Sequence, residues 1–304
     1  MRISEETVRK LVAAQFPEWT DLPVRQVRSA GTVNAIFRIG AGLTARFPLR
    51  DIESGNERAS ETERDSEIEQ VRQEIEAEAR AARLLHGKTR FGTPEPVAIG
   101  EPGYGYPLPW SVQTWLPGTI ATDDDPGDSE PFARDLAELI TAMRAVGTEG
   151  RTFDGRGRGG VIADHEGWVQ TCLTESERLL PVPRLRRLWE AMRELPRGSD
   201  KDVMTHGDLM PGNMLVAAGR LAGVLDVGGF RPADPALDLT CAWHLLEPGP
   251  RRVLRAELGC DDLEWARGRA WAFEQSLGLV WYYETSNPVM SGIGRRTLER
   301  ILSG

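Results

Sequence analysis

One stretch of the chain concentrates side chains that suit phosphoryl transfer. It reads HGDLMPGN from His206 to Asn213, and the apolar run LAGVLD then ends at Asp226 before two glycines. Phosphoryl transfer needs a carboxylate near the attacking hydroxyl and oxygen ligands for Mg²⁺ on the nucleotide phosphates. Asp208 suits the first task, and Asn213 and Asp226 suit the second. The loop, strand, turn and strand of this segment place Asn213 and Asp226 near one another, and His206 is expected to fix the loop by hydrogen bonding.

The same residue types also form ordinary turns, so HGD alone is a weak signal. The complete set, followed by a strand and Asp226, favours the catalytic interpretation. Together with DPALDL at residues 234–239, these motifs make the chain resemble the aminoglycoside phosphotransferase family, antibiotic kinases that are distantly related to protein kinases. The resemblance runs from about Val24 to Trp281 and implies a two-lobed, protein-kinase-like fold. It also implies Asp208 as the catalytic base, with Asn213 and Asp226 as metal ligands.

A second pair of acids, Asp234 and Asp238 in RPADPALDL, is expected to be structural. Pro235 predicts the start of a helix, where Asp234 would cap free backbone N–H groups. The negative charge of Asp238 would be favourable near the positive end of the helix dipole. In the resembled family this motif supports the catalytic loop.

The N-terminal part offers a candidate site for the nucleotide phosphates. A kinase-type site needs a turn over the phosphates, a cation on a strand and a helix acid that positions this cation. The turn candidate contains Ser29, Thr32 and Asn34 as donors to phosphate oxygens. An ordinary hairpin has a similar composition, so both interpretations stay open for this turn.

The cation candidate is Arg46 in LTARFP, a run that matches the third strand of the resembled family by pattern. Only three of the 37 basic residues are lysines, and a guanidinium binds phosphate oxygens through a fork of donors. An exposed strand arginine is the alternative interpretation. We expect the partner of Arg46 to be Glu78 on the following helix, with Glu74, one turn earlier on the same face, as the alternative.

A hinge strand is predicted in WSVQTWLPG, where the backbone from Gln113 to Trp115 would read the purine edge. Trp110 and Trp115 suit core packing equally well. The chain has neither a GxxxxGK[ST] motif nor a GxGxxG motif before a helix, which excludes the commonest alternative nucleotide folds.

Acids of the helical half are candidates for binding an amine-rich acceptor. Glu274 and Glu284 flank FEQSLGLVWYYE, in which Trp281 and Tyr282 suit stacking on a sugar or a flat ring, although a core role for these aromatics is equally open. Four further acids share the helical half but are more simply solvated: Glu247, Asp261, Asp262 and Glu264.

The pattern of elements predicts an α+β fold. Residues 4–14 predict a helix, residues 24–48 three antiparallel strands, residues 51–70 a charged insertion, and residues 67–86 a second helix. The remainder is mainly helical around a strand-like stretch at 203–227. We therefore expect a nucleotide-binding lobe at 1–112, a hinge at 113–118 and a helical lobe at 119–304 that holds the catalytic loop and the acceptor site.

Composition narrows the class of partner. The 304 residues carry a net charge of -9, which disfavours a nucleic-acid partner and suits a cationic small molecule. Three cysteines without a CxxC pair argue against a disulfide framework and a zinc site. No apolar run suits a membrane span or a signal peptide, which favours a cytoplasmic protein. We expect the protein to be a monomer or a homodimer.

The expected activity is a Mg²⁺-dependent kinase that moves the γ-phosphoryl of ATP or GTP to a hydroxyl of an aminoglycoside-like antibiotic and so confers antibiotic resistance. The alternatives are a macrolide, nucleoside-antibiotic or metabolite kinase of the same fold, and a catalytically inactive nucleotide-binding scaffold.

Overall fold

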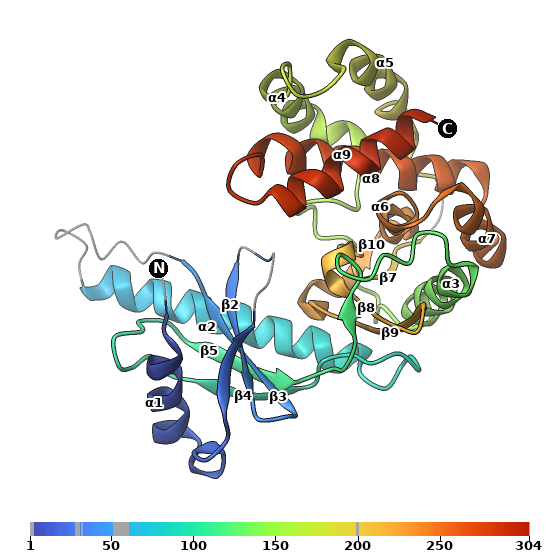
Figure 1. The fold of residues 1–304 in the computed structure, drawn as a ribbon. Coiled ribbons are helices and arrows are strands. Elements are labelled where there is room, and N and C mark those ends of the chain that lie inside the picture. The colour runs from blue at the N-terminus through green and yellow to red at the C-terminus, as the bar shows by residue number, and fades with distance from the viewer. Residues whose placement is uncertain (1–2, 28–30, 32, 51–60, 199–200, 304) are drawn as a thin grey trace. The chain divides into compact units, whose positions relative to one another are not determined.

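The computed structural model describes residues 3–27, 31, 33–50, 61–198 and 201–303. The chain forms two compact units (Figure 1). The N-terminal unit comprises Met1–His86 and Thr93–Pro117, and the C-terminal unit comprises Gly87–Gly92 and Gly118–Gly304. The N-terminal unit contains a sheet and the C-terminal unit is mainly helical, which confirms the predicted α+β class.

The N-terminal unit is built on a five-stranded antiparallel sheet in the order β1-β2-β3-β5-β4. Its strands are β1 (Val24–Val27), β2 (Asn34–Ile39), β3 (Leu43–Pro48), β4 (Pro96–Gly100) and β5 (Trp110–Thr114). Helix α1 (Glu5–Gln15) begins at the N-cap Ser4, whose side chain accepts the N–H of Thr7, and a 3₁₀ turn follows at Pro17–Trp19.

Aromatic side chains fill the core of this unit. Phe47 stacks on Trp110 with ring centroids 4.8 Å apart and meets Phe37 edge to face at 5.6 Å. Trp110 is fully buried in this cluster. The structure therefore assigns Trp110 to core packing, one of the two roles that its sequence left open.

Helix α2 (Glu61–Leu85) begins earlier than the start predicted near residue 67. Residues 61–70, which we expected to belong to a charged insertion, are helical, because glutamate and arginine favour helices even without large apolar neighbours. Ile68 also packs on the apolar core, and Val71 and Ile75 continue the buried face. Residues 51–60 lie outside the described residues.

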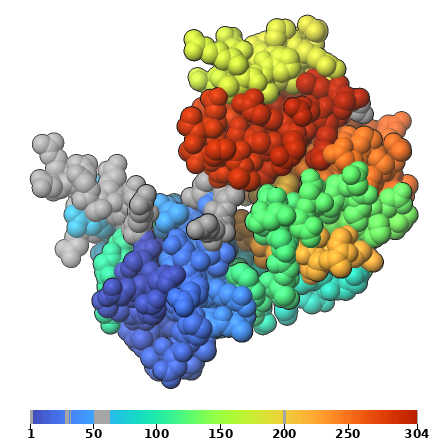
Figure 2. All heavy atoms as spheres, viewed as in Figure 1, coloured from blue at the N-terminus to red at the C-terminus, as the bar shows by residue number. Residues whose placement is uncertain are grey.

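The C-terminal unit contains α3 (Glu130–Arg144), α4 (Glu166–Glu175), α5 (Val182–Met192), α6 (Cys241–Leu245), α7 (Pro248–Leu258), α8 (Asp262–Tyr282) and α9 (Pro288–Ser303). Helix α8 contacts α4, α5, α6 and α9, and most of its residues from 267 to 280 are buried on all sides. Figure 2 shows α4 and α5, in yellow, lying directly on the red C-terminal helices.

Short strands carry the motif residues of this unit. The strand-like stretch forms β7 (Val203–Thr205), β8 (Met214–Ala217) and β9 (Arg220–Val224). Strand β8 lies between β9 and β6 (Thr119–Ile120), and β7 pairs with β10 (Arg231–Ala233). The HGDLMPGN segment therefore connects β7 to β8, and Asp226 lies between β9 and β10.

Short 3₁₀ helices complete the unit at Ile162–His165, Pro211–Asn213, Val227–Gly229 and Pro235–Thr240. All three cysteines are buried free thiols. No helix in the described part of the chain combines the length and apolar character needed to cross a membrane.

Candidate active site

The catalytic loop, residues 206–213, is anchored by a buried carboxylate. The N–H groups of His206 and Gly207 donate to Asp238 at 3.0 and 2.8 Å. Burial raises the pKa of Asp238, whereas nearby His206 and the two N–H donors favour its charged form. Gly207 has a φ of 77°, a conformation that glycine adopts without steric cost. Asp238 therefore supports the catalytic loop, as the family resemblance implies.

His206 connects this loop to the end of β9. Its Nε2 lies 2.9 Å from the carbonyl oxygen of Leu225, and its Nδ1 accepts the N–H of Asp208 at 3.3 Å. Asp234 caps the following 3₁₀ helix by accepting the N–H of Ala236 at 3.0 Å. Both side chains have the structural contacts expected of them.

Three donors surround the side chain of Asp208. Gln275 Nε2 and Arg158 Nη2 lie 2.6 and 3.3 Å from its Oδ1, and Asn213 Nδ2 lies 3.0 Å from its Oδ2. A carboxylate offers about four acceptor positions, so these contacts leave one on Oδ2. The side chain is 41% exposed. Asp208 is thus held in orientation and still has an oxygen that can accept the proton of a hydroxyl group.

Asn213 and Asp226 occupy the adjoining ends of the β8–β9 pair. The N–H of Leu225 donates to the carbonyl oxygen of Asn213 at 2.8 Å, which confirms the predicted proximity at the backbone. Asp226 is exposed, and its backbone has the left-handed conformation, with φ 55° and ψ 48°. This conformation costs a non-glycine residue about 1–2 kcal/mol of steric strain. The Asn213 amide nitrogen also donates to the Asp208 carbonyl oxygen at 2.9 Å, so the amide oxygen of Asn213 points elsewhere.

This donor pair fits Mg²⁺. Magnesium usually takes one or two protein oxygens and completes its octahedron with phosphate oxygens and water. The described residues contain no cluster of three or more His, Cys, Asp or Glu side chains able to hold a metal alone. An amide and a carboxylate completed by a nucleotide therefore suit this chain better than a metal site made of protein ligands only.

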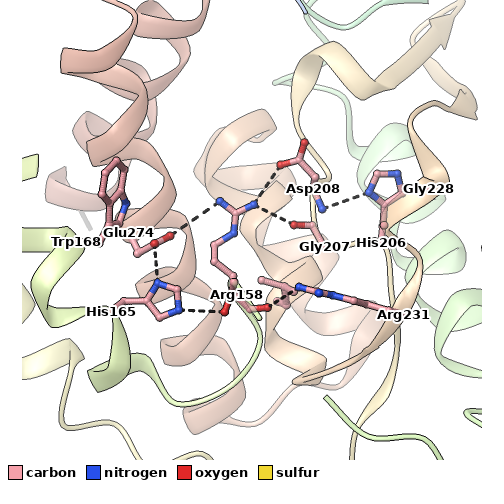
Figure 3. Close-up of a pocket in the computed structure, with 12 residues that line it drawn as sticks. Arg158, His165, Trp168, His206, Gly207, Asp208, Gly228, Arg231 and Glu274 are labelled. Atoms are coloured by element: carbon pink, nitrogen blue, oxygen red, sulfur yellow. Dashed lines mark hydrogen bonds and ion pairs between the residues drawn. The ribbon is translucent and has the colours of Figure 1, made fainter. Parts of the chain in front are cut away.

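A cavity of about 630 Å³ opens beside Asp208 (Figure 3). Glycines and charged side chains from distant segments form its wall. The lining residues are Gly157, Arg158, His165, Trp168, His206, Gly207, Asp208, Gly228, Gly229, Arg231, Leu237 and Glu274. Its volume is within the range of small-molecule sites.

Glu274 of α8 contributes a second carboxylate to this cavity. Its side chain is 5% exposed, and its Oε1 bonds His165 Nδ1 at 2.8 Å. This bond raises the pKa of His165, against the effect of burial. Among the described residues the other carboxylate oxygen, Oε2, has no hydrogen-bond partner, and it faces Arg158 Nη1 at 4.0 Å.

The other predicted acceptor residues lie elsewhere. Trp281 and Tyr282 are at the C-terminal end of α8, about two helical turns beyond Glu274. Tyr282 is 61% exposed, and Glu284 is exposed beyond the helix end. Trp281 contacts Trp168, a lining residue, with ring centroids 6.1 Å apart. Of the four predicted acceptor residues, only Glu274 lines the cavity.

Four further acids of the helical half have other partners. Glu247 and Glu264 pair with Arg300 and Arg144, Asp262 pairs with Arg255, and Asp261 is the N-cap of α8. An acceptor site rich in carboxylates is therefore not assembled from these residues.

In the N-terminal unit, Arg46 of β3 donates to Glu78 of α2 at 3.1 Å. Glu74 instead pairs with Arg50, with 3.2 Å between Nη1 and Oε1. Asn34 lines a small cavity with Arg46 and Glu78. The contact preferred from the sequence is therefore present. The other two turn candidates, Ser29 and Thr32, lie outside the described residues.

Of the hinge candidates, Gln113 belongs to the interior strand β5 and Trp115 directly follows it. The N–H of Trp115 donates to the carbonyl oxygen of Gly42 at 2.8 Å, and that of Thr114 donates to Glu95 at 2.9 Å. The ring of Trp115 lies 4.6 Å from the Arg38 guanidinium. Two N–H groups of the segment predicted to read a purine, from Gln113 to Trp115, are thus used within the sheet, because β5 pairs on both edges.

The sequence profile of the phosphotransferase enzyme family, APH, matches residues 26–271. The chain belongs to this family. The resemblance found in the motifs is thereby confirmed.

Two relatives are aminoglycoside 3'-phosphotransferases. The protein from Escherichia coli is 37% identical over 79 residues, 25% of this chain and 29% of that protein. The protein from Streptomyces fradiae is 31% identical over 182 residues, 57% of this chain and 65% of that protein. The matched parts thus span less than two thirds of each relative.

A solved structure shares the fold. The GDP complex of aminoglycoside 2'-phosphotransferase-IIIa superimposes on this chain with a TM-score of 0.69. The superposition covers 99% of both chains at 17% sequence identity.

Sequence reasoning missed several residues around Asp208. Gln275 follows Glu274 in FEQSLGLVWYYE, where the charged and aromatic residues are the stronger signals for a binding site. Arg158 belongs to the run GRGRGG at residues 155–160, whose alternating glycines were an available signal. His165 and Arg231 stand in ordinary contexts, and only the fold shows that they line the cavity.

Proposed function

We propose that this phosphotransferase moves the γ-phosphoryl group of Mg²⁺-bound ATP or GTP to a hydroxyl of an aminoglycoside-like antibiotic. The carrying observation is Asp208, a partly exposed carboxylate that lines a cavity of ligand size and is bonded to Asn213. Asp226 lies at the end of the adjoining strand. The relatives named for aminoglycoside phosphorylation support the acceptor class.

The transfer needs one proton acceptor and two changes of bonding at phosphorus. The acceptor hydroxyl gives its proton to Asp208, and its oxygen forms a bond to the γ-phosphorus. The bond from phosphorus to the bridging oxygen breaks, and its electron pair leaves with the nucleoside diphosphate. Gln275 and Asn213 keep the carboxylate in one orientation throughout, which reduces the entropy lost on reaching the reactive geometry.

The metal and the phosphates both require ligands. Asn213 and Asp226 would hold Mg²⁺, which, when bound, neutralises charge on the phosphate oxygens. Arg46 is the proposed phosphate ligand of the N-terminal unit, and Glu78 orients its guanidinium. Glu274 and Asp208 are the carboxylates that an ammonium group of the acceptor would meet in the cavity.

Two broader inferences accompany this activity. The use of ATP or GTP favours the cytoplasm, where these nucleotides are abundant. We infer a monomer or a homodimer, which sedimentation of the purified protein distinguishes from larger assemblies.

A transfer assay tests the proposal. The purified protein, Mg²⁺ and either ATP or GTP are incubated with a panel of aminoglycosides, macrolides, nucleoside antibiotics and hydroxylated metabolites. Mass spectrometry then detects a product heavier by one phosphoryl group. Phosphorylation of an aminoglycoside that is lost in D208N supports the proposal. Transfer to a macrolide or metabolite alone replaces the acceptor class, and nucleotide binding without transfer or hydrolysis favours an inactive scaffold.

A further inference from the structure

The segment GRGRGG, residues 155–160 and here called the arginine loop, is held rigidly by its own carbonyl groups. All five carbonyls from Arg156 to Gly160 face donors at hydrogen-bonding distance, and Arg231 Nη2 reaches that of Arg158 at 3.5 Å. Arg231 Nη2 reaches Arg156 at 2.7 Å, His165 Nε2 reaches Gly157 at 3.2 Å, the Asp234 N–H reaches Gly159 at 2.9 Å, and Arg267 Nη2 reaches Gly160 at 2.9 Å. The backbone of the loop is therefore fixed on successive residues.

The loop also packs closely against β10. Gly159 has a φ of 110°, and a Cβ atom added there would lie 2.7 Å from Ala233 Cβ. This contact leaves no room for a side chain at Gly159. The glycines serve a tight path that brings Arg158 to a defined place beside the catalytic loop.

The side chain of Arg158 is held much more loosely than its backbone. Its Nη2 donates to Asp208 Oδ1 at 3.3 Å and to the Gly207 carbonyl oxygen at 3.2 Å, while Nη1 stays 4.0 Å from Glu274 Oε2 (Figure 3). Within the described part of the chain, Nε and Nη1 donate no hydrogen bond. A guanidinium has five donors, so this one retains several for a further anion.

The other cations of the cavity are committed. Arg231 bonds the carbonyl oxygen of Arg156 and also reaches Asp154 at 3.4 Å. Both ring nitrogens of His165 have partners. Within the catalytic loop itself, Met210 is uncharged and buried, and its sulfur accepts from Gln275. Among the residues that line the cavity, Arg158 is the cation that combines contact with Asp208 and unused donors.

We propose that Arg158 binds the phosphoryl group during its transfer and stabilises the negative charge on its oxygens. The inference rests on the proposed function, because it assigns a residue to that reaction. The transition state spreads charge over the three equatorial oxygens of the phosphoryl group, and a planar fork of donors matches two of them. As the acceptor proton reaches Asp208, the carboxylate becomes neutral and its attraction for Arg158 falls. The guanidinium is then released toward the phosphoryl oxygens at the moment when their charge needs stabilisation.

Kinetics of three variants test this role. R158M removes the charge and keeps much of the side-chain volume, R158K keeps the charge without the fork, and R156M changes an exposed arginine of the same loop as a matched control. We expect R158M to lower kcat by about 10²- to 10³-fold with small changes in both KM values, as for other residues that stabilise developing charge. R158K should recover part of the loss, and R156M should match the wild type.

A second measurement separates stabilisation of the transferring group from a structural role. Aluminium fluoride with Mg²⁺ and ADP or GDP mimics a planar phosphoryl group, and calorimetry measures its binding. R158M should bind the diphosphate as the wild type does and lose about 10²-fold of the extra affinity that the fluoride adds. A structural role would instead weaken both complexes and lower Tm.

Each outcome decides the inference. Unchanged kcat and fluoride binding in R158M overturn it. Tighter acceptor binding by R158M at unchanged kcat also overturns the inference. The Arg158 side chain would then only occupy the position at which a cationic group of the acceptor binds. Should the wild type phosphorylate nothing in the panel, the proposed function fails, and fluoride binding still reports on Arg158.

Discussion

The catalytic loop and the arginine loop approach the same carboxylate and are held in opposite ways. The catalytic loop gives backbone N–H groups to a buried side chain, Asp238. The arginine loop gives carbonyl oxygens to donors that include the buried guanidinium of Arg267. The first arrangement fixes Asp208 itself, whereas the second fixes a backbone and leaves the guanidinium of Arg158 adjustable. The site thus combines a fixed carboxylate, Asp208, with a guanidinium that can adjust its position, Arg158.

The sharpest test of the catalytic side is D208N. The amide keeps the shape of the side chain and cannot take up the acceptor proton, so kcat should fall by about 10³- to 10⁴-fold. Binding of Mg²⁺-nucleotide, measured by calorimetry, should remain close to that of the wild type. Turnover within tenfold of the wild type would remove Asp208 from the role of base.

The anchor of the arginine loop is tested by R267M. Arg267 bonds Asp234 at 2.8 Å from its Nε, and it also reaches the carbonyl oxygens of Gly160 and Pro196. Removing one partner of a buried ion pair leaves the other charge uncompensated, at a cost of about 3–5 kcal/mol. Urea unfolding should show this loss in the free energy of unfolding. Asp234→Asn, which removes the opposite charge, combined with R267M should cost less than the sum of the two single changes.

A smaller effect is expected at the acceptor carboxylate. In E274Q the charge facing Arg158 disappears while the volume is retained. For an acceptor whose ammonium group binds there, KM should rise about tenfold at nearly constant kcat, because an ion-paired hydrogen bond contributes about 1.5 kcal/mol or more. Glu284→Gln is the matched control, since this exposed acid lies outside the cavity. Equal KM values in both variants would move the ammonium site away from Glu274.

The two loops also differ in how much of their structure can be predicted from the sequence. The catalytic loop was predictable because its residues follow one another, and a short antiparallel pair brings Asn213 toward Asp226 without any long-range fold. The Arg46 contact with Glu78 followed from strand and helix patterns. The cavity, however, joins Arg158 to Asp208 across 50 positions and His165 to Glu274 across 109. Periodicity along one helix cannot show such contacts, so the sequence alone did not identify Arg158 or His165 as residues of the cavity.

The smallest expected effect concerns pH and the His165–Glu274 bond beside the arginine loop. The hydrogen bond to Glu274 raises the pKa of His165 above its ordinary 6.5. Its stabilisation is therefore complete below about pH 6.5, the value in unfolded chains, and is lost as the pH rises through the higher folded pKa. H165N keeps a donor and removes the titration, so the wild type should exceed it in free energy of unfolding at pH 6 by less than about 1.5 kcal/mol, and by less again at pH 9. A difference that grows with pH would mean that His165 is neutral in the folded protein, and the carbonyl of Gly157 in the arginine loop would then be held by a neutral ring.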